Sequence, residues 1–156
     1  MDTYIKLVYL FAKECEELIK SISPELYQEQ LELMKPQEIK IGNLWTSCIS
    51  NFNSAAKTHT DGVNVKWANN IIYYKRENST GWNLHLPWYD IVVDSADDSL
   101  LFYPAWKSMH GVEEITPTKT WGYRNSIVLY PLDISYDTKS WEESNVGNSD
   151  EAITSN

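Results

Sequence analysis

Three residues of this sequence have the types and spacing that a metal ion requires. His59 and Asp61 are two apart, at a strand end or in the loop after it, and residues i and i+2 of an extended segment project to the same side. His110 begins a later β-type segment, where a folded-back sheet brings it opposite that pair. Two histidines and one carboxylate on one face of a metal leave adjacent positions open, as in non-haem Fe(II) sites. We therefore expect His59, Asp61 and His110 to be metal ligands with a catalytic role.

A second pair of residues suits a dicarboxylate ligand. Arg124 lies within an apolar β-type segment, and Ser126 follows it on the same side of the strand. A guanidinium in such surroundings needs a partner, because burying an unpaired charge is costly. If the ketoacid end of 2-oxoglutarate chelates the iron, its far carboxylate needs a bidentate cation and a hydroxyl donor. We expect Arg124 and Ser126 to provide them.

The order His-x-Asp, a distal His and then Arg-x-Ser resembles the Fe(II)/2-oxoglutarate-dependent dioxygenase superfamily. All five positions of that pattern are occupied here, and the resemblance covers roughly residues 42–133. It implies a double-stranded β-helix that uses Fe(II), with 2-oxoglutarate and O2 as cosubstrates. The implied reaction hydroxylates a C–H bond of the primary substrate and releases succinate and CO2.

The flanking segments are most similar to the branch that contains the TET and J-binding-protein nucleobase hydroxylases. The similarity is carried by Trp45-Thr46-Ser47, Asn51-Phe52-Asn53, the run from His59 to Asn64, Leu84-His85-Leu86-Pro87 and the run from Asp98 to Phe102. The sequence departs from that branch at Trp82 and at Asp97, where glycine is usual. The branch resemblance implies a methyl group on a nucleobase as the target.

Several other functions are compatible with the same residues. A prolyl or small-molecule hydroxylase of this superfamily has the same ligand set and suits a chain of this size. A non-catalytic, cupin-like module that binds a metal or ligand keeps the fold without turnover. A related metalloenzyme uses Fe or Mn without 2-oxoglutarate, and its activity would not depend on Arg124.

Asn64 and Tyr73 are further candidates for binding the cosubstrate. Asn64 repeats the His-x-Asp-x-x-Asn order of the branch. Tyr73 and Tyr74 alternate in facing, so one of them looks into the cavity, and a one-residue change of register exchanges the two. A base extruded into the pocket needs an aromatic side chain on which to stack, and the candidates are Trp67, Trp82, Trp88 and Trp106.

The periodicity of apolar residues predicts two helices followed by β-structure. Between residues 4 and 22 apolar side chains recur three or four apart, and Ser23-Pro24 starts a second helix that Pro36 ends. After Gly42, short runs of β-branched and aromatic residues alternate with turn residues. This pattern predicts a mainly β fold, a cupin-like jelly roll with the helices against its outside. The expected strands are residues 44–50, 66–76, 82–88, 91–93, 99–103, 111–116 and 123–132.

Length and charge narrow the expected organisation and partners. A chain of 156 residues predicts one domain over residues 1–135, with a helical part at 1–40 and a jelly roll at 42–133. The formal net charge of −9 has the wrong sign for extensive contact with duplex DNA. Residues 136–156 are acidic and poor in apolar residues, which predicts a disordered tail. No segment is typical of a signal peptide or a membrane span, so we expect a cytoplasmic protein without a membrane partner.

Overall fold

The structure is a computed structural model that describes residues 3–133. It begins with the helices α1 (Thr3–Ile22) and α2 (Pro24–Met34), and a short 3-10 helix, η1 (Pro87–Tyr89), follows later. Neither helix combines the length and the apolar character needed to cross a bilayer. The predicted tail, 136–156, lies outside the described residues. The strands are β1 (Ser47–Phe52), β2 (Ala56–His59), β3 (Asn70–Glu77), β4 (Ser79–Gly81), β5 (Leu84–Leu86), β6 (Ile91–Val93), β7 (Ser99–Tyr103), β8 (His110–Val112), β9 (Ile115–Pro117) and β10 (Tyr123–Tyr130).

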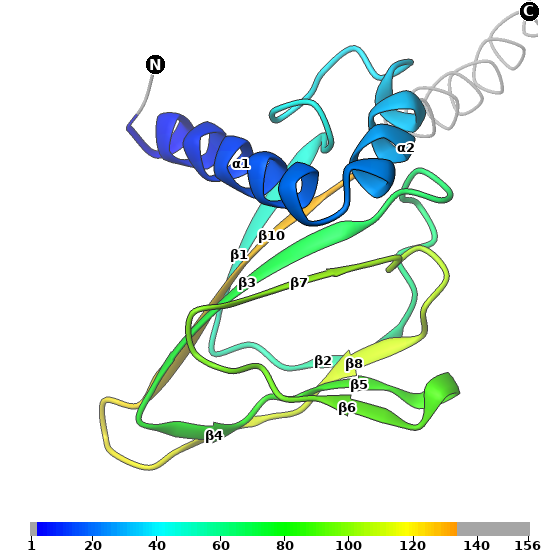
Figure 1. Cartoon of the computed structure of the whole chain (residues 1–156). Helices are drawn as coiled ribbons and strands as arrows, with labels where there is room; N and C mark the ends of the chain where they lie inside the picture. The colour runs from blue at the N-terminus through cyan, green and yellow to red at the C-terminus, as the bar shows by residue number, and fades with distance from the viewer. Residues whose placement is uncertain (1–2, 134–156) are drawn as a thin grey trace, which may run out of the picture.

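Eight of these strands form two antiparallel sheets of four strands that face one another (Figure 1). The major sheet has the order β1-β10-β3-β7 and the minor sheet the order β2-β8-β5-β6, while β4 and β9 form a separate pair. The first strand therefore pairs with the last, and apart from the consecutive pair β5 and β6 the neighbours in each sheet are not consecutive in sequence. This arrangement is a double-stranded β-helix, which confirms the predicted jelly roll.

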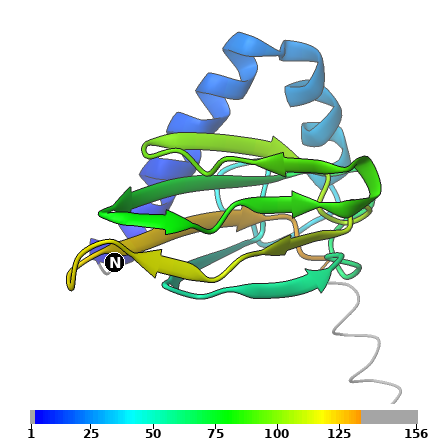
Figure 2. The ribbon, with the colours of Figure 1, turned by 90° about the horizontal axis from the view of Figure 1, so that it is seen from below.

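Both helices cover the outer face of the major sheet, and the minor sheet lies on the other side (Figures 1 and 2). The inward side chains of α1 are spaced three or four apart, as expected for one helix face. They form a core with residues of the loop before β1 and of the major sheet, made of Ala12, Cys15, Ile19, Leu44, Trp45, Ile71 and Leu129. A second core cluster lies between the sheets and contains Ile72, Tyr74, Leu84, Tyr103 and Ala105. The helices thus support, from behind, the sheet that forms one wall of the interior.

The strands differ from the expected ones in several places: neither β2 nor β4 is expected, and β1 and β3 begin three and four residues later than predicted. The sequence does not predict β2 because this segment, Ala-Lys-Thr-His, is largely exposed and has no run of β-branched or aromatic residues. The strand expected at 82–88 is shortened to β5, because Pro87 begins η1. The strand expected at 111–116 is two strands, β8 and β9, which belong to different sheets.

A buried carboxylate joins α1 to the turn that precedes β1. Glu16 is 5% exposed and accepts hydrogen bonds from the backbone N–H of Asn43 at 2.5 Å, from Asn43 Nδ2 at 2.8 Å and from the backbone N–H of Leu44 at 3.3 Å. The turn contains Gly42, whose φ of +66° favours glycine and at which a Cβ atom would lie 2.1 Å from Glu16 Oε1. The helix and the turn are therefore fitted to each other through this one side chain.

We predict that Glu16→Ala lowers the free energy of unfolding by about 3 kcal/mol, because it leaves buried N–H groups without their charged acceptor. Chemical denaturation followed by circular dichroism measures this change. Glu14→Ala, at an exposed position of the same helix, is the matched control and should leave stability unchanged. Equal losses in the two variants would show that the helix, and not the buried contact, is responsible.

Candidate metal centre

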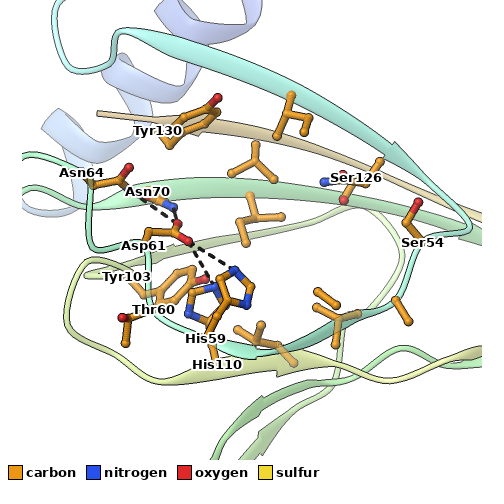
Figure 3. A pocket seen from close by; sticks show the side chains of 18 of the residues that line it. Ser54, His59, Thr60, Asp61, Asn64, Asn70, Tyr103, His110, Ser126 and Tyr130 are labelled. Carbon is orange, nitrogen blue, oxygen red and sulfur yellow. Dashed lines mark hydrogen bonds and ion pairs between the residues drawn. The ribbon is translucent and has the colours of Figure 1, made fainter. Parts of the chain in front are cut away.

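A cavity of about 490 Å³ lies between the two sheets and is lined by six of the seven site residues that the sequence predicts. His59, Asp61 and His110 line one part of it, and Arg124 and Ser126 also contribute to its wall. Figure 3 shows the three potential metal ligands pointing toward one another and Ser126 further along the cavity. Much of the remaining wall is apolar and includes Ile49, Ile72, Leu84, Val112 and Val128.

The pairing of β2 with β8 brings the two histidines together. His59 ends β2, His110 begins β8, and the two are register partners whose ring centroids are 4.4 Å apart. Nδ1 of His59 lies 2.7 Å from the Lys57 carbonyl oxygen, and Nδ1 of His110 lies 2.8 Å from that of Ser108. Because a carbonyl oxygen only accepts, each Nδ1 is the protonated donor and each Nε2 carries the free lone pair. Both Nε2 atoms are therefore available to a metal.

Close contacts hold β2, β8 and the loop between β2 and β3 together around the site. A Cβ atom on Gly111 would lie 3.1 Å from Thr58 Oγ1 and 3.3 Å from the Ala56 carbonyl oxygen, so a larger residue would need β2 to give way by a few tenths of an ångström. The backbone N–H of Asp61 donates to the Ala105 carbonyl oxygen at 3.0 Å. These contacts hold the ligand-bearing segments in place.

The two carboxylate oxygens of Asp61 have different surroundings. Oδ1 lies 3.4 Å from His59 Nε2 and 3.8 Å from His110 Nε2. Oδ2 accepts hydrogen bonds from Asn70 Nδ2 at 2.8 Å and from Asn64 Nδ2 at 3.4 Å. The hydrogen bonds to Oδ2 leave Oδ1 as the oxygen directed at the histidines.

The three side chains together have the properties of a divalent metal site. Their ligand atoms all lie within 4.8 Å of one another. Burial lowers the pKa of His110, which favours the neutral imidazole that binds metals. The ring of Tyr103 packs edge-on against His110 at 5.5 Å, and burial raises the pKa of this tyrosine, so it stays a neutral phenol. Two imidazoles and one carboxylate oxygen suit Fe(II) and similar ions.

Arg124 in β10 is a buried cation between two aromatic rings. It is 2% exposed, and its guanidinium carbon lies 4.1 Å from the ring centre of Trp82 and 4.6 Å from that of Tyr74. Among residues 3–133 no ion pair includes Arg124, and its Nε atom has no hydrogen-bond partner. Burial lowers the pKa of Arg124 to about 10, which shows how poorly the charge is compensated.

Further polar groups around Arg124 fit an anion in the cavity. Ser126 is 4% exposed and lines the cavity on the same face of β10. The Trp82 indole N–H is buried and has no hydrogen-bond partner within residues 3–133, and the Tyr74 hydroxyl is buried beside the Arg124 guanidinium. Unsatisfied buried donors are rare because each costs free energy. A carboxylate beside Arg124 would satisfy several of these groups at once.

The strand register corrects the prediction that Tyr73 binds the cosubstrate. Ser126 is the register partner of Tyr74, and cross-strand partners share a face, so Tyr74 is the tyrosine that lines the cavity. Tyr73 lies on the other face of β3, where its hydroxyl donates to Asp98 Oδ1 at 2.5 Å. The alternation of the two tyrosines is as expected, and only the choice between them is wrong.

Asn64 lines the cavity, but its amide group serves the metal ligand. Its Nδ2 donates to Asn70 Oδ1 at 2.9 Å and lies near Asp61 Oδ2. A contact between Asn64 and the cosubstrate stays a prediction. Sequence reasoning missed Asn70, which is 2% exposed, because a single asparagine at the start of a strand carries no recognisable signal.

Comparisons with known proteins bear on the fold. No family model and no curated protein matches the sequence. Among solved structures, NgTET1 in complex with 5mC DNA superposes with a TM-score of 0.60 at 18% sequence identity. The match covers 89% of this chain and 56% of that chain, so this chain spans little more than half the length of the protein it resembles.

The fold and the three converging side chains define this chain as a double-stranded β-helix protein with a His-x-Asp…His metal-ligand set. At the level of the fold, the likeness to NgTET1 agrees with the double-stranded β-helix that the sequence resemblance implies.

Proposed function

We propose that this protein is an Fe(II)- and 2-oxoglutarate-dependent dioxygenase that hydroxylates a C–H bond of its substrate. One observation carries the proposal: a single cavity holds three converging ligand atoms and a buried guanidinium without a carboxylate partner among the described residues. A bound Fe(II) would supply O2 activation, coupled to conversion of 2-oxoglutarate to succinate and CO2. The ketoacid end of 2-oxoglutarate matches the metal held by the three ligands, and its far carboxylate matches the buried guanidinium.

In that reaction, the residues of this chain bind and orient the cosubstrate and exclude water. Arg124, with the hydroxyls of Ser126 and Tyr74, donates hydrogen bonds to the far carboxylate of the dicarboxylate. This contact orients the ketoacid end toward His59 and Asp61. The apolar cavity wall keeps water away from the reacting centre, which protects the reaction from side products.

A methyl group on a pyrimidine base is the substrate that we infer. The flanking motifs resemble those of nucleobase hydroxylases, and the NgTET1 structure contains 5mC DNA. The net charge of −9 favours limited contact, as with a nucleotide or a short unpaired strand, over a long duplex footprint.

An aromatic surface near the metal centre suits such a base. Trp67 is 68% exposed and packs edge-on against Trp106 at 5.0 Å, and Lys107 Nζ lies 5.9 Å and 5.5 Å from the two ring centres. The loops that carry the two tryptophans are the ones joined by the hydrogen bond between Asp61 and Ala105. Trp67 has a φ of +73°, which is uncommon for a bulky residue, and strained backbone of this kind tends to cluster at functional sites. An exposed indole pair with a cation fits a stacked base and its phosphate.

Succinate release from 2-oxoglutarate tests the proposed function and its substrate together. The purified protein is incubated with Fe(II), O2 and a panel of methylated nucleosides, single-stranded and duplex oligonucleotides, a proline-containing peptide and buffer alone. We expect stimulation by a substrate with a methylated pyrimidine. Stimulation by the peptide alone would make the protein a prolyl hydroxylase instead. Metal and 2-oxoglutarate binding without succinate under any condition would identify a non-catalytic binding module.

We predict that Trp67→Ala raises the KM for the nucleobase substrate about tenfold, because stacking of a base on an aromatic ring contributes about 1–3 kcal/mol. Turnover of 2-oxoglutarate without substrate should not change. The matched control is Trp121→Ala, since Trp121 is 54% exposed and also has a lysine, Lys119, at 5.0 Å, but lies in the loop between β9 and β10. Equal effects of the two substitutions would rule out a specific role for Trp67.

A further inference from the structure

The oxygen of Asp61 that faces away from the histidines is held by a buried pair of amides. Asn70 Nδ2 donates to Asp61 Oδ2 at 2.8 Å, and Asn70 Oδ1 accepts from Asn64 Nδ2 at 2.9 Å. Asn70 is 2% exposed and Asn64 5%. Both amides are fixed by each other, so they cannot turn away from Asp61 without losing a buried hydrogen bond. Figure 3 shows Asn64 and Asn70 beside Asp61, on the side away from the two histidines.

Asn69, the residue before Asn70, is held by hydrogen bonds to Gln30 of helix α2. Gln30 Oε1 accepts from the Asn69 backbone N–H at 2.8 Å and from Asn69 Nδ2 at 3.2 Å. Gln30 Nε2 donates to the Asn69 carbonyl oxygen at 3.0 Å and to the Leu44 carbonyl oxygen at 3.0 Å. The Asn69 carbonyl also accepts from Trp45 Nε1 at 3.1 Å. Gln30 is 1% exposed, and its bond to Leu44 is buried while its bonds to Asn69 are partly buried.

These hydrogen bonds act directly on the peptide unit that links Asn69 to Asn70. The Asn69 carbonyl group belongs to the planar peptide that links Asn69 to Asn70, so fixing that oxygen fixes the orientation in which β3 begins. The Asn70 side chain extends from that point and donates one hydrogen bond to Asp61. A path of partly buried hydrogen bonds, joined by the peptide between Asn69 and Asn70, therefore runs from α2, on the outer face of the major sheet, to a candidate metal ligand in the interior.

We propose that Gln30 and Asn70 are positioning residues for the metal centre, so that helix α2 sets the orientation of Asp61. Groups that hydrogen-bond to a ligating carboxylate fix its rotamer and determine which oxygen is presented to the metal. Here Asn70 occupies Oδ2 and directs Oδ1 to His59 and His110. The proposal rests on the metal site of the proposed function and extends it to a helix that lines no part of the cavity.

Binding of Co(II) to the metal-free protein tests this proposal without any need for catalysis. Co(II) accepts imidazole and carboxylate ligands, and its visible absorption reports both affinity and ligand geometry. The variants are Asn70→Ala, Gln30→Met and the double variant, and circular dichroism shows that each is folded. Glu16→Ala is the matched control, because it removes a buried hydrogen-bond network on α1 that does not contact Asn69 or Asn70.

We expect Asn70→Ala and Gln30→Met each to weaken Co(II) binding about 10- to 100-fold, the usual effect of losing an outer partner of a ligand. The Co(II) spectrum should change in both. The double variant should lose less than the product of the two single effects, because both act through one path. Glu16→Ala should lose stability but keep the wild-type affinity and spectrum.

Two results would overturn the proposal separately from the proposed function. Wild-type Co(II) affinity and spectrum in a folded Gln30→Met variant would show that α2 does not position the ligand. If Gln30→Met does not fold, wild-type Co(II) affinity and spectrum in a folded Asn70→Ala variant would show that Asn70 does not position Asp61. A wild-type protein that binds no Co(II) would instead contradict the metal centre itself, and with it the proposed function.

Discussion

Replacing Arg124 by Met is expected to reduce the stabilisation that 2-oxoglutarate gives the protein to that given by a ketoacid without the far carboxylate, while the protein without cosubstrate is as stable as the wild type or more stable. The guanidinium is buried against Tyr74 and Trp82 and has no carboxylate partner among the described residues. A buried cation without a counter-ion opposes folding, and an apolar side chain of similar length removes that cost. The presence of Arg124 at this position is thus best explained by the binding of an anionic ligand and not by a contribution to the stability of the fold.

The lowered pKa of Arg124 gives the size and the pH range of this effect. A fall from 12.5 to about 10 corresponds to about 3 kcal/mol of unfavourable free energy for the charged form. Because the folded-state pKa is the lower one, the cost is present in full below about pH 10 and is relieved as the pH rises above that value. Arg124→Met should therefore gain stability by up to about 3 kcal/mol across the neutral range.

Thermal denaturation with Mn(II) under anaerobic conditions measures both parts of the prediction. In the wild type, 2-oxoglutarate should bind at least about 100-fold more tightly than 2-oxobutyrate, which keeps the ketoacid but lacks the far carboxylate. In Arg124→Met the two ligands should bind equally. The control is Arg76→Met, since Arg76 is the register partner of Arg124 on β3 but pairs with Asp94 outside the cavity. A variant at Arg124 that still prefers 2-oxoglutarate would refute the assignment.

Replacing Asp61 by Ala should remove metal binding and succinate formation together. The loss of an outer hydrogen-bond partner alone weakens metal sites about 10- to 100-fold, so losing a ligand should cost more than about 100-fold. Metal content after dialysis and succinate release are measured on the same samples. The fold should persist, because Asp61 lies in a loop and its side chain is partly exposed.

The third histidine provides the control for the ligand substitutions. His85 alternates with Leu84 on β5 and lies outside the cavity wall, and its Nε2 atom is 2.7 Å from Glu113 Oε1. His85→Ala should retain metal and activity. If His85→Ala and Asp61→Ala lost metal to the same extent, the metal would not be bound in this cavity.

The sequence predicts the metal centre because its members are few and their order is informative. His59 and Asp61 are separated by one residue, and His110 can meet them only if β2 and β8 pair, as they do. The helical face of α1 and the two-residue step from Arg124 to Ser126 are periodic patterns that local physics dictates. The helical face and the Arg124–Ser126 step follow from spacing alone, whereas the meeting of His110 with His59 and Asp61 also requires the long-range pairing of β2 with β8.

The remaining features depend on register and on contacts between distant segments. Tyr74 rather than Tyr73 faces the cavity because of its pairing with Ser126, and no local pattern distinguishes the two. Gln30 and Asn69 are 39 residues apart, and an isolated glutamine in an amphipathic helix is expected on the solvent side. Only the packing of α2 on the sheet shows that Gln30 is buried and fully bonded.

Anaerobic titration of the metal-free protein with Fe(II) and 2-oxoglutarate tests the central claim most directly. A ketoacid chelated to Fe(II) gives a weak visible charge-transfer band, which forms only if metal and cosubstrate occupy one site. We predict this band in the wild type and in His85→Ala, and its absence in His110→Ala and in Arg124→Met at limiting 2-oxoglutarate. A folded wild-type protein without the band would contradict the assignment of this cavity as an Fe(II)/2-oxoglutarate site.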